Sequence, residues 1–274
     1  MYKILLKTKF KIVAYLNLSN ISEVNRIDIS KKNIENIELL YDNQKVKLKN
    51  IFNVRISKNG KTKNEILISG SNEYFHYLGY SWEDNILIVD SNVGFFTGAR
   101  MKSGKLIVGG SSGDFLGSEM EGGFLEVKKN AGDYLASSLE GSRVGMKGGN
   151  ILINGNVGEF SCAFMRRGLV VIKGNVRENC CFQMVAGTLI ICKDVRRKLG
   201  VSMKRGTIIL MNNSIPLEKN FVKSGTINFN FLGLLRNYLI KESLLRDFKN
   251  SKFVRYFGDK NNDGLGEIFV REKL

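Results

Sequence analysis

Apolar residues and glycines recur along this chain at a fixed step of 19 residues. Each unit has a large apolar anchor, a glycine three residues later (asparagine in the first unit), and apolar residues two and four positions beyond, as in Met101, Gly104, Leu106 and Val108. The anchors are Trp82, Met101, Met120, Met146, Met165, Met184, Met203 and Val222. The interval from 120 to 146 holds one step and an insertion of seven residues. A repeat of this length predicts a solenoid.

The short apolar run within each unit has the two-residue alternation of a β-strand, and β-branched residues are frequent in it. The glycine fits a tight corner whose backbone angles, or whose contact with a neighbouring backbone, exclude a β-carbon. One unit buries too few side chains to offset the entropy lost on ordering it, so coils must stack, about 4.8 Å apart. The pattern predicts a mainly β fold: a parallel β-helix of 19-residue coils, with the methionines as core fillers inside it.

The repeat covers only part of the chain, and we expect three regions. Residues 1–78 lack the repeat and contain strand-like runs, which predicts a small β-rich N-terminal cap over the first coil. Residues 79–230 form the parallel β-helix. Residues 231–274 begin with a helical pattern from Leu232 to Phe248, with Leu235, Leu239 and Leu244 on one side, and end in an extended, ordered arm.

The composition indicates where the protein acts and which kinds of site it can hold. No stretch is long and apolar enough to span a membrane, and lysines interrupt the apolar residues at the start, so we expect a cytoplasmic protein. Cys162 and Cys181 share a repeat position and would stack; a disulfide fits the geometry, whereas reduced thiols fit the cytoplasm. Cys180 and Cys192 have no CxxC partner or nearby histidine, so we expect no metal site. The formal net charge of +16 fits either the composition of an AT-rich genome or an acidic partner.

No set of residues predicts catalysis. His76 is the only histidine, so any mechanism with a histidine base would need it, yet its aromatic neighbours are typical of a packed hydrogen-bonding residue. Asp114, Asp133 and Glu159 predict a short acidic ladder, which fits a cation or acid–base site, a solvated corner or a contact with another protein. The Gly-Gly pairs lack the Gly-Lys-Ser/Thr sequence of a phosphate loop. We expect no catalytic residue in this chain.

Basic residues gather directly after the methionine anchors. Because equal repeat positions stack, neighbouring cations there would lie about 5 Å apart and repel by roughly 1 kcal/mol in water. Such cations either splay into solvent or hold anions between them. The candidate binding residues are Lys147, Arg166, Arg167, Lys204 and Arg205, with Arg143 from the insertion. Arg177 and Arg196 form a second stack at another repeat position.

The glycine-centred coils, the methionine anchors and the Gly-x-x-x-Gly corners, such as Gly94/Gly98, resemble a known family. It comprises the C-terminal β-helix domain of glutamate synthase and the C-type β-helix subunit of formylmethanofuran dehydrogenase. Within it, the chain is similar to the corresponding C-type member of the formyltransferase/hydrolase complex of methylotrophic bacteria. The resemblance covers residues 80–210 and, more loosely, the tail; it is carried by segments 141–149, 164–168, 184–188, 203–207 and 255–259. Ala136, Arg177 and Arg196 depart from the corner glycines.

This resemblance implies a right-handed coil and a scaffold subunit without catalytic residues of its own. In one-carbon metabolism, such a complex moves a formyl group from a tetrahydromethanopterin carrier to a methanofuran-type cofactor and releases it as formate. The implied partners are amidohydrolase-like, dehydrogenase-like and formyltransferase subunits. This chain would hold no cofactor tightly, but its basic ladder would suit the polyglutamate tail of the cofactor.

Two alternatives stay open. One is a glutamate-synthase-like β-helix domain protein, although that domain normally ends a much longer chain. The other is a free-standing solenoid that binds polyanions. Nucleic acid is not the expected polyanion, because the basic positions lack interleaved aromatic residues for base stacking and no nucleic-acid-binding motif is present.

Overall fold

The computed structural model describes residues 1–212, 217–227, 230–245 and 252–272 of the chain. The strands are β1 (Tyr2–Thr8), β2 (Leu16–Asn17), β3 (Glu38–Tyr41), β4 (Gln44–Lys47), β5 (Phe52–Lys58), β6 (Glu65–Ser69), β7 (Phe75–His76), β8 (Ile86–Val89), β9 (Lys105–Val108), β10 (Phe124–Val127), β11 (Asn150–Ile153), β12 (Leu169–Ile172), β13 (Thr188–Ile191), β14 (Thr207–Leu210), β15 (Val222–Ile227), β16 (Phe253–Gly258) and β17 (Gly266–Arg271). The helices are the 3-10 helix η1 (Ser19–Asn25), α1 (Lys31–Glu35), α2 (Leu48–Ile51) and α3 (Asn230–Lys241). The mainly β prediction is confirmed.

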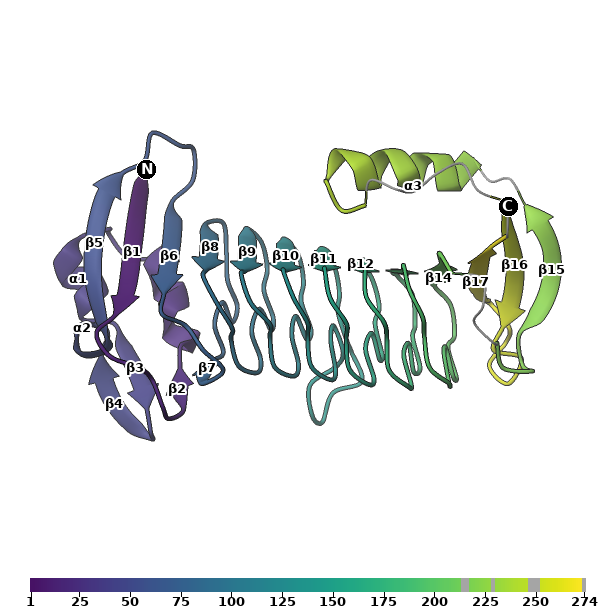
Figure 1. The fold of residues 1–274 in the computed structure, drawn as a ribbon, viewed down its shortest axis with the longest axis horizontal. Helices are drawn as coiled ribbons and strands as arrows, with labels where there is room; N and C mark the ends of the chain where they lie inside the picture. The colour runs from purple at the N-terminus through teal and green to yellow at the C-terminus, as the bar shows by residue number, and fades with distance from the viewer. Residues whose placement is uncertain (213–216, 228–229, 246–251, 273–274) are drawn as a thin grey trace.

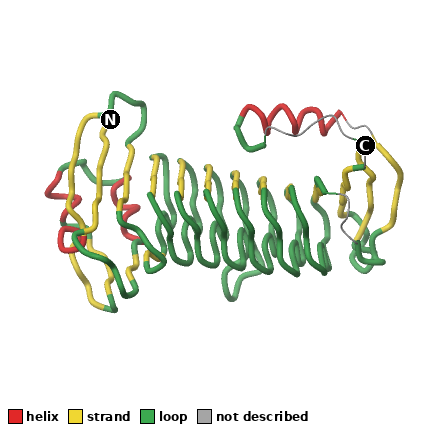
Figure 2. The backbone as a smooth tube through the Cα atoms, in the orientation of Figure 1, coloured by secondary structure: helices red, strands yellow, loops and turns green. Residues whose placement is uncertain are grey.

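Most strands belong to one sheet of 13 strands, in the order β15-β16-β17-β14-β13-β12-β11-β10-β9-β8-β6-β1-β5. The strands β8 to β14 come from successive repeats and pair in parallel along the stack (Figure 1). Leu106 pairs with Leu125 and Leu125 with Ile151, so the insertion does not shift the register. A second row of parallel bridges, such as Val157 to Val176, joins coils on another side. Figure 2 shows each coil as one short strand and a long loop.

The methionine anchors line the inside of the stack, as the sequence predicts. Met101, Met120, Met146, Met165, Met184 and Met203 have no exposed surface. The methyl group of each anchor lies against a glycine of the following coil: a Cβ at Gly168 would come within 2.7 Å of the Met146 Cε. At Gly149, a Cβ would lie 2.8 Å from backbone atoms of Gly122 and Gly123. Both positions also have a positive φ, so glycine is required there for space and for conformation.

The eighth predicted coil, anchored at Val222, is not part of the stack. Val222 is 40% exposed, and a Cβ at Gly225 would meet nothing within 4 Å. The strand that contains both residues, β15, pairs antiparallel with β16 instead of parallel with β14. The prediction of this coil is therefore wrong. It assumed that the next strand in the sequence is also the next strand in the sheet, which parallel stacking does not require.

The last strand, β17, occupies the predicted place of the eighth coil. It pairs in parallel with β14, with Ile268 opposite Ile208. Gly266 takes the role of the corner glycine, because a Cβ there would lie 2.6 Å from the Met203 Cε. Ile268 and Val270 follow at the two apolar positions of the repeat. The expected extended arm is thus the antiparallel pair of β16 and β17, which places a strand beside the edge of the last coil.

The first part of the chain covers the opposite end of the stack (Figure 1). The strand β6 pairs in parallel with β8, and β1 and β5 extend the same sheet beyond β6. A smaller sheet, in the order β4-β3-β2-β7, lies beside it. The first coil therefore has a paired edge and a covered core, which a solenoid needs at each end.

Helix α3 lies over the outer face of the last strands (Figure 1). Leu239 is buried in one cluster with Val171 and Ile190, which point outward from β12 and β13. The helix ends at Lys241, and Phe248 of the predicted helical pattern lies outside the described residues. The amphipathic pattern thus explains why this segment covers the sheet.

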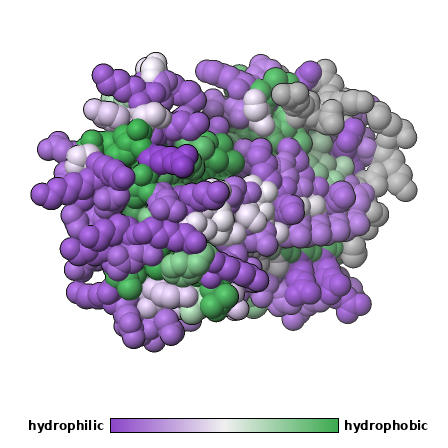
Figure 3. All heavy atoms as spheres, turned by 60° about the vertical axis from the view of Figure 1, so that its left-hand side comes forward, coloured by the Kyte–Doolittle hydropathy of each residue, from purple (hydrophilic) through white to green (hydrophobic). Residues whose placement is uncertain are grey.

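Toward the N-terminal end, where α3 does not reach, the same outer face is open. Leu5, Leu67, Ile88 and Ile107 follow one another in a row through strand pairing, and all four are half-buried. Figure 3 shows apolar residues gathered in a broad patch on this side of the molecule, among hydrophilic ones.

The corner glycines yield a test of coil stacking. Gly149 and Gly141 both have a positive φ, but a Cβ at Gly141 would meet nothing within 4 Å. Gly141→Ala should therefore cost only the left-handed backbone, about 1 kcal/mol of unfolding free energy. Gly149→Ala should cost at least about 2 kcal/mol more, because the backbone of the previous coil must move. Urea unfolding of both variants measures this difference, and equal losses would contradict the stacking account.

Candidate functional site

The predicted basic residues, apart from Arg143, lie at the two positions directly after the anchors, which we call the methionine corner. At this corner, two consecutive backbone N–H groups donate to the carbonyl oxygen of the previous anchor. Arg166 and Arg167 donate to Met146 at 2.9 and 3.1 Å, and other coils repeat this arrangement. These hydrogen bonds hold equal repeat positions above one another. Side chains at the methionine corner therefore stand in columns at the spacing of the coils.

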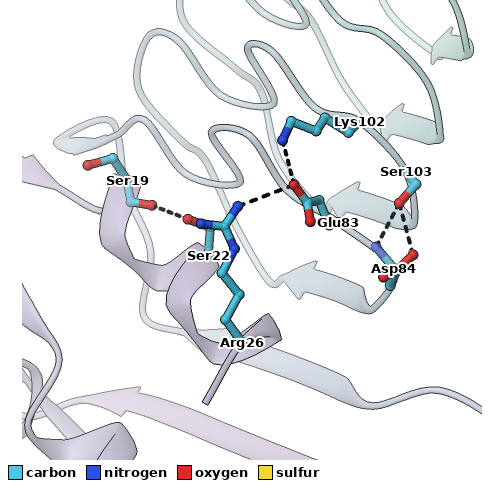
Figure 4. A network of polar contacts seen from close by, with 7 residues as sticks. All are labelled: Ser19, Ser22, Arg26, Glu83, Asp84, Lys102 and Ser103. Carbon is cyan, nitrogen blue, oxygen red and sulfur yellow. Dashed lines mark hydrogen bonds and ion pairs between the residues drawn. The ribbon is translucent and has the colours of Figure 1, made fainter.

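The first coils of the methionine corner carry paired charges (Figure 4). Glu83 accepts a hydrogen bond from Lys102 at 2.7 Å and pairs with Arg26, next to η1, at 3.3 Å. The hydrogen bond from Lys102 is the main cause that lowers the pKa of Glu83. One position further, Ser103 Oγ donates to Asp84 at 3.1 Å and accepts from the backbone N–H of Asp84 at 2.9 Å. Here the columns tie coils to each other and to the N-terminal residues.

Lys147, one of the predicted binding residues, continues this pairing. Its Nζ lies 3.0 Å from Glu121 Oε1 of the previous coil, and both side chains are exposed. The positive charge of Lys147 is therefore compensated within the chain. The sequence places Glu121 and Lys147 at equal repeat positions, so this ion pair follows from the insertion length and the repeat.

The later coils of the methionine corner carry uncompensated positive charge. Arg166, Arg167, Lys204 and Arg205 are all exposed, and none has an ion pair within the part of the chain that the structure describes. The coil between the two pairs has valine and alanine at these positions. The pairs therefore stand two coils apart, about 9.6 Å. We call these four residues the basic corner.

Arg143 and the second basic stack lie elsewhere. Arg143 is exposed on the insertion, and no contact joins it to the other predicted residues within the described ranges. Arg177 and Arg196 are also exposed and line a shallow depression of about 370 Å³ together with Asn175 and Asp194. The structure thus brings together four of the six predicted residues as unpaired cations, adds Lys147 as a paired one, and separates Arg143.

The histidine has a packing role. His76 is 6% exposed, and its ring lies between Tyr15 and Phe95, with ring centroids at 4.7 and 3.7 Å. Its Nδ1 accepts a hydrogen bond from the backbone N–H of Phe95 at 3.2 Å. Burial lowers the pKa of His76 to about 4, so the ring is neutral at pH 7.

Two of the three carboxylates of the predicted acidic ladder, those of Asp114 and Asp133, hold backbone groups. Asp114 Oδ1 accepts from the backbone N–H of Asp133 at 2.8 Å, and Asp133 Oδ1 accepts from that of Glu159 at 2.7 Å. Each carboxylate thereby fixes the start of the corner in the next coil. This bonding explains why acidic residues recur at this position without forming a catalytic pair.

Three of the cysteines, Cys162, Cys180 and Cys181, are buried and form no disulfide. Cys162 and Cys181 have no exposed surface and share a left-handed corner position with glycines of other coils. Burial raises the pKa of the Cys181 thiol. No group of three or more potential metal-binding side chains occurs in the described ranges. Within the same ranges, no helix is long and apolar enough to cross a bilayer.

One feature of the coils was not predicted from the sequence: a ladder of aromatic rings. Tyr77, Phe96, Phe115, Tyr134 and Phe160 each stand five residues before an anchor or, at the insertion, at the equivalent repeat position. Their successive centroids are 4.7, 4.9, 4.7 and 5.4 Å apart, with interplanar angles of 21° or less. The signal is present in the sequence as aromatic residues at the repeat step. We call these five residues the aromatic corner.

Comparison with known proteins identifies a similar structure. No protein-family model matches this sequence, and no curated protein matches it. A chain in the crystal structure of the formyltransferase/hydrolase complex (FhcABCD) from Methylorubrum extorquens, in complex with methylofuran, has the same fold, with a TM-score of 0.85. The two chains are 24% identical, and the likeness covers 98% of this chain and 100% of that chain.

The burial of His76 predicts a specific dependence of stability on pH. Between pH 6.5 and about 4, the unfolded chain binds a proton at His76 that the folded chain does not bind, so stability falls as the pH drops. The contribution is absent above pH 6.5 and amounts to about 2 kcal/mol between pH 7 and pH 5. His76→Asn keeps an acceptor in place of Nδ1 but cannot titrate. Urea unfolding at both pH values should show a smaller loss for the variant; identical losses would contradict the assignment.

Proposed function

We propose that this chain is a non-catalytic scaffold subunit of a multisubunit formyltransferase/hydrolase complex in the cytoplasm. The observation that carries this proposal is the fold likeness to a chain of the FhcABCD complex, which extends over nearly all of both chains. Its partners would be amidohydrolase-like, dehydrogenase-like and formyltransferase subunits. In this proposal the coil is right-handed and residues 1–78 cap it. Within the predicted ranges 79–230 and 231–274, the stacked strands run from β8 to β14 and end with β17.

The use of the titratable residues supports a scaffold role. The groups that would serve as an acid, a base or a nucleophile are engaged in packing or backbone bonding: His76 between two rings, Asp114 and Asp133 on backbone N–H groups, and Cys181 in the core. What the coils offer to solvent is a set of columns with a regular spacing. Such columns are better suited to the docking of other polypeptides than to catalysis.

We further propose that the basic corner holds the polyglutamate tail of a methanofuran-type cofactor, in a complex that also uses tetrahydromethanopterin. The related complex was solved with methylofuran. Arg166 with Arg167, and Lys204 with Arg205, give two cationic pairs about 9.6 Å apart. An extended polyglutamate chain advances about 3.3 Å per residue, so three residues span that distance. Lys147 and Arg143 would contribute less, because the first is paired with Glu121 and the second lies on the insertion.

A free-standing solenoid that binds polyanions is the second candidate, and the uncompensated charge of the basic corner favours it. A glutamate-synthase-like domain protein is less favoured, because the likeness extends over the whole of the neighbouring chain. The two leading candidates differ in whether the chain needs partner subunits to bind its anion.

The basic corner gives a direct test. In the complex purified with the tagged chain, Arg166→Glu combined with Arg167→Glu removes two attractions to the tail and adds two repulsions. At about 0.5 kcal/mol each, these sum to about 2 kcal/mol, or roughly a 30-fold weaker hold on the cofactor. Cofactor retention, measured by mass spectrometry of the purified complex at low and high salt, reports this change.

Arg177→Glu combined with Arg196→Glu is the matched control, because it makes the same change in charge on another face. This control should retain the cofactor as the unsubstituted complex does. Equal retention by both double variants, with assembly intact, would exclude the basic corner as the site of the tail.

A further inference from the structure

The aromatic corner presents the edges of its rings to the surroundings. Its five rings are stacked almost parallel along the coil axis, so the faces of the inner rings are covered by their neighbours. Four of the rings are half-buried, and Tyr134, near the middle of the insertion-bearing coil, is 36% exposed. Five ring edges in a row form an apolar strip along this corner of the coils.

The insertion turns this strip into a groove. A depression of about 460 Å³ lies between three rings of the aromatic corner (Phe115, Tyr134 and Phe160) and residues 137–142, with Phe164 and Phe182 also in its lining. The wall is held in place by hydrogen bonds: the backbone N–H of Leu139 reaches Glu119 at 3.4 Å, and that of Gly145 donates to the carbonyl of Phe164 at 2.9 Å. The seven inserted residues therefore build one side of a groove, which explains their place in an otherwise regular repeat.

Carboxylates stand beside the groove on a strongly basic chain, and one of them, Glu140, is part of its lining. Asp114, Asp133, Glu159 and Glu178 stand in the column next to the ring column, one residue before it in each coil. Glu140 is exposed on the wall. None of these five carboxylates has an ion pair within the described ranges, and Asp114 and Asp133 use only one oxygen each for the backbone of the next coil. The formal net charge of the chain is +16, so this corner is a local reversal of sign.

We infer that this groove receives a segment of a different polypeptide, in which an apolar side chain is flanked by lysine or arginine. The apolar side chain packs against the ring edges, which favour the face of another ring or an aliphatic group. The flanking cations pair with Glu140 in the lining and with Asp133 and Glu159, which directly precede the lining residues Tyr134 and Phe160. This inference deepens the proposed function and rests on it, because it assigns one docking surface of the scaffold to another member of the complex.

The charge of each possible binding partner also indicates which one fits this groove. A second copy of this chain would bring another +16 and a broad repulsion between the copies. A nucleic acid would meet Glu140 in the lining and the column of carboxylates beside the rings. A basic segment of another protein is the occupant whose charge and apolar content both complement the groove.

The last coils show which substitutions the corner tolerates. Lys198 stands at the repeat position of Tyr134 and has nearly the same φ, 63° against 60°. Arg197 stands at the repeat position of Glu159. Tyr134→Lys combined with Glu159→Arg therefore places residues that this fold already accommodates, while it removes the apolar edge and reverses the charge. Tyr2→Lys is the matched control, because Tyr2 is equally exposed at 36% and lies on β1, at the far end of the sheet.

The experiment is affinity purification of the tagged full chain from native cells, with each partner quantified by mass spectrometry. The double variant should lose at least one partner tenfold or more relative to the unsubstituted chain, with an unchanged unfolding temperature, whereas Tyr2→Lys should retain all partners. A photo-crosslinking residue at Tyr134 should join the chain to a partner segment with lysine or arginine near an apolar residue.

The outcomes separate this inference from the proposed function. If the unsubstituted chain brings down no larger subunits, the proposed function fails. If it does and the double variant brings them down equally, only the groove assignment fails. Crosslinks between two copies of this chain, or a change in self-association in the double variant, would overturn the choice of occupant.

Discussion

Each coil of this protein is set in place by the contact between a buried methionine and the glycine of the following coil. The methyl group of Met146, for example, fills the space that a side chain at Gly168 would need. The carbonyl of the same methionine accepts two N–H groups from the next coil, so core packing and backbone bonding fix the same register. The methyl groups of the six methionine anchors all pack against a glycine of the following coil, so the coils keep equal repeat positions above one another.

This constraint has a consequence for the surface. Once the inside is fixed, side chains that point outward can change from coil to coil without a cost in packing. The methionine corner changes from the paired Glu83 and Lys102 to the unpaired Arg166 and Lys204. The ring column likewise ends in Asn179 and Lys198, which keep the left-handed backbone of the aromatic residues before them. The two ends of the stack therefore differ in the residue types and charges at equal repeat positions, more than in any single residue.

The sequence predicts the repeated part of this fold well, because each buried joint depends on residues a fixed distance apart. It fails where the order of strands in space departs from their order in the chain. Val222 and Gly225 have the spacing of an eighth coil, but Gly266 and Ile268 have it too, and only tertiary pairing decides between them. Met203 is the last methionine among the anchors, so no methionine anchor precedes either strand to show which of them joins the stack.

The sequence likewise predicts those parts of the candidate site that follow the repeat. The stacking of Arg166, Arg167, Lys204 and Arg205 follows from the repeat, and so does the ion pair of Lys147, whose partner Glu121 has the equal repeat position one coil away. The aromatic corner also repeats at the step of 19 residues and could have been predicted. A search for charged and catalytic residue types does not find it, because its members are phenylalanines and tyrosines. The groove beside it depends on the backbone path of the insertion. The inserted residues lie outside the repeat, so the repeat does not predict this path.

We propose that this stack of coils is a docking scaffold and that its partner subunits carry out the catalysis. Native mass spectrometry of the tagged chain purified from its own cells, joined to a formyl-transfer assay of each separated species, tests this most directly. We expect an assembly with larger subunits that is active as a whole, and an isolated chain that is folded and inactive. Turnover by the isolated chain, or its purification without any partner, would contradict it.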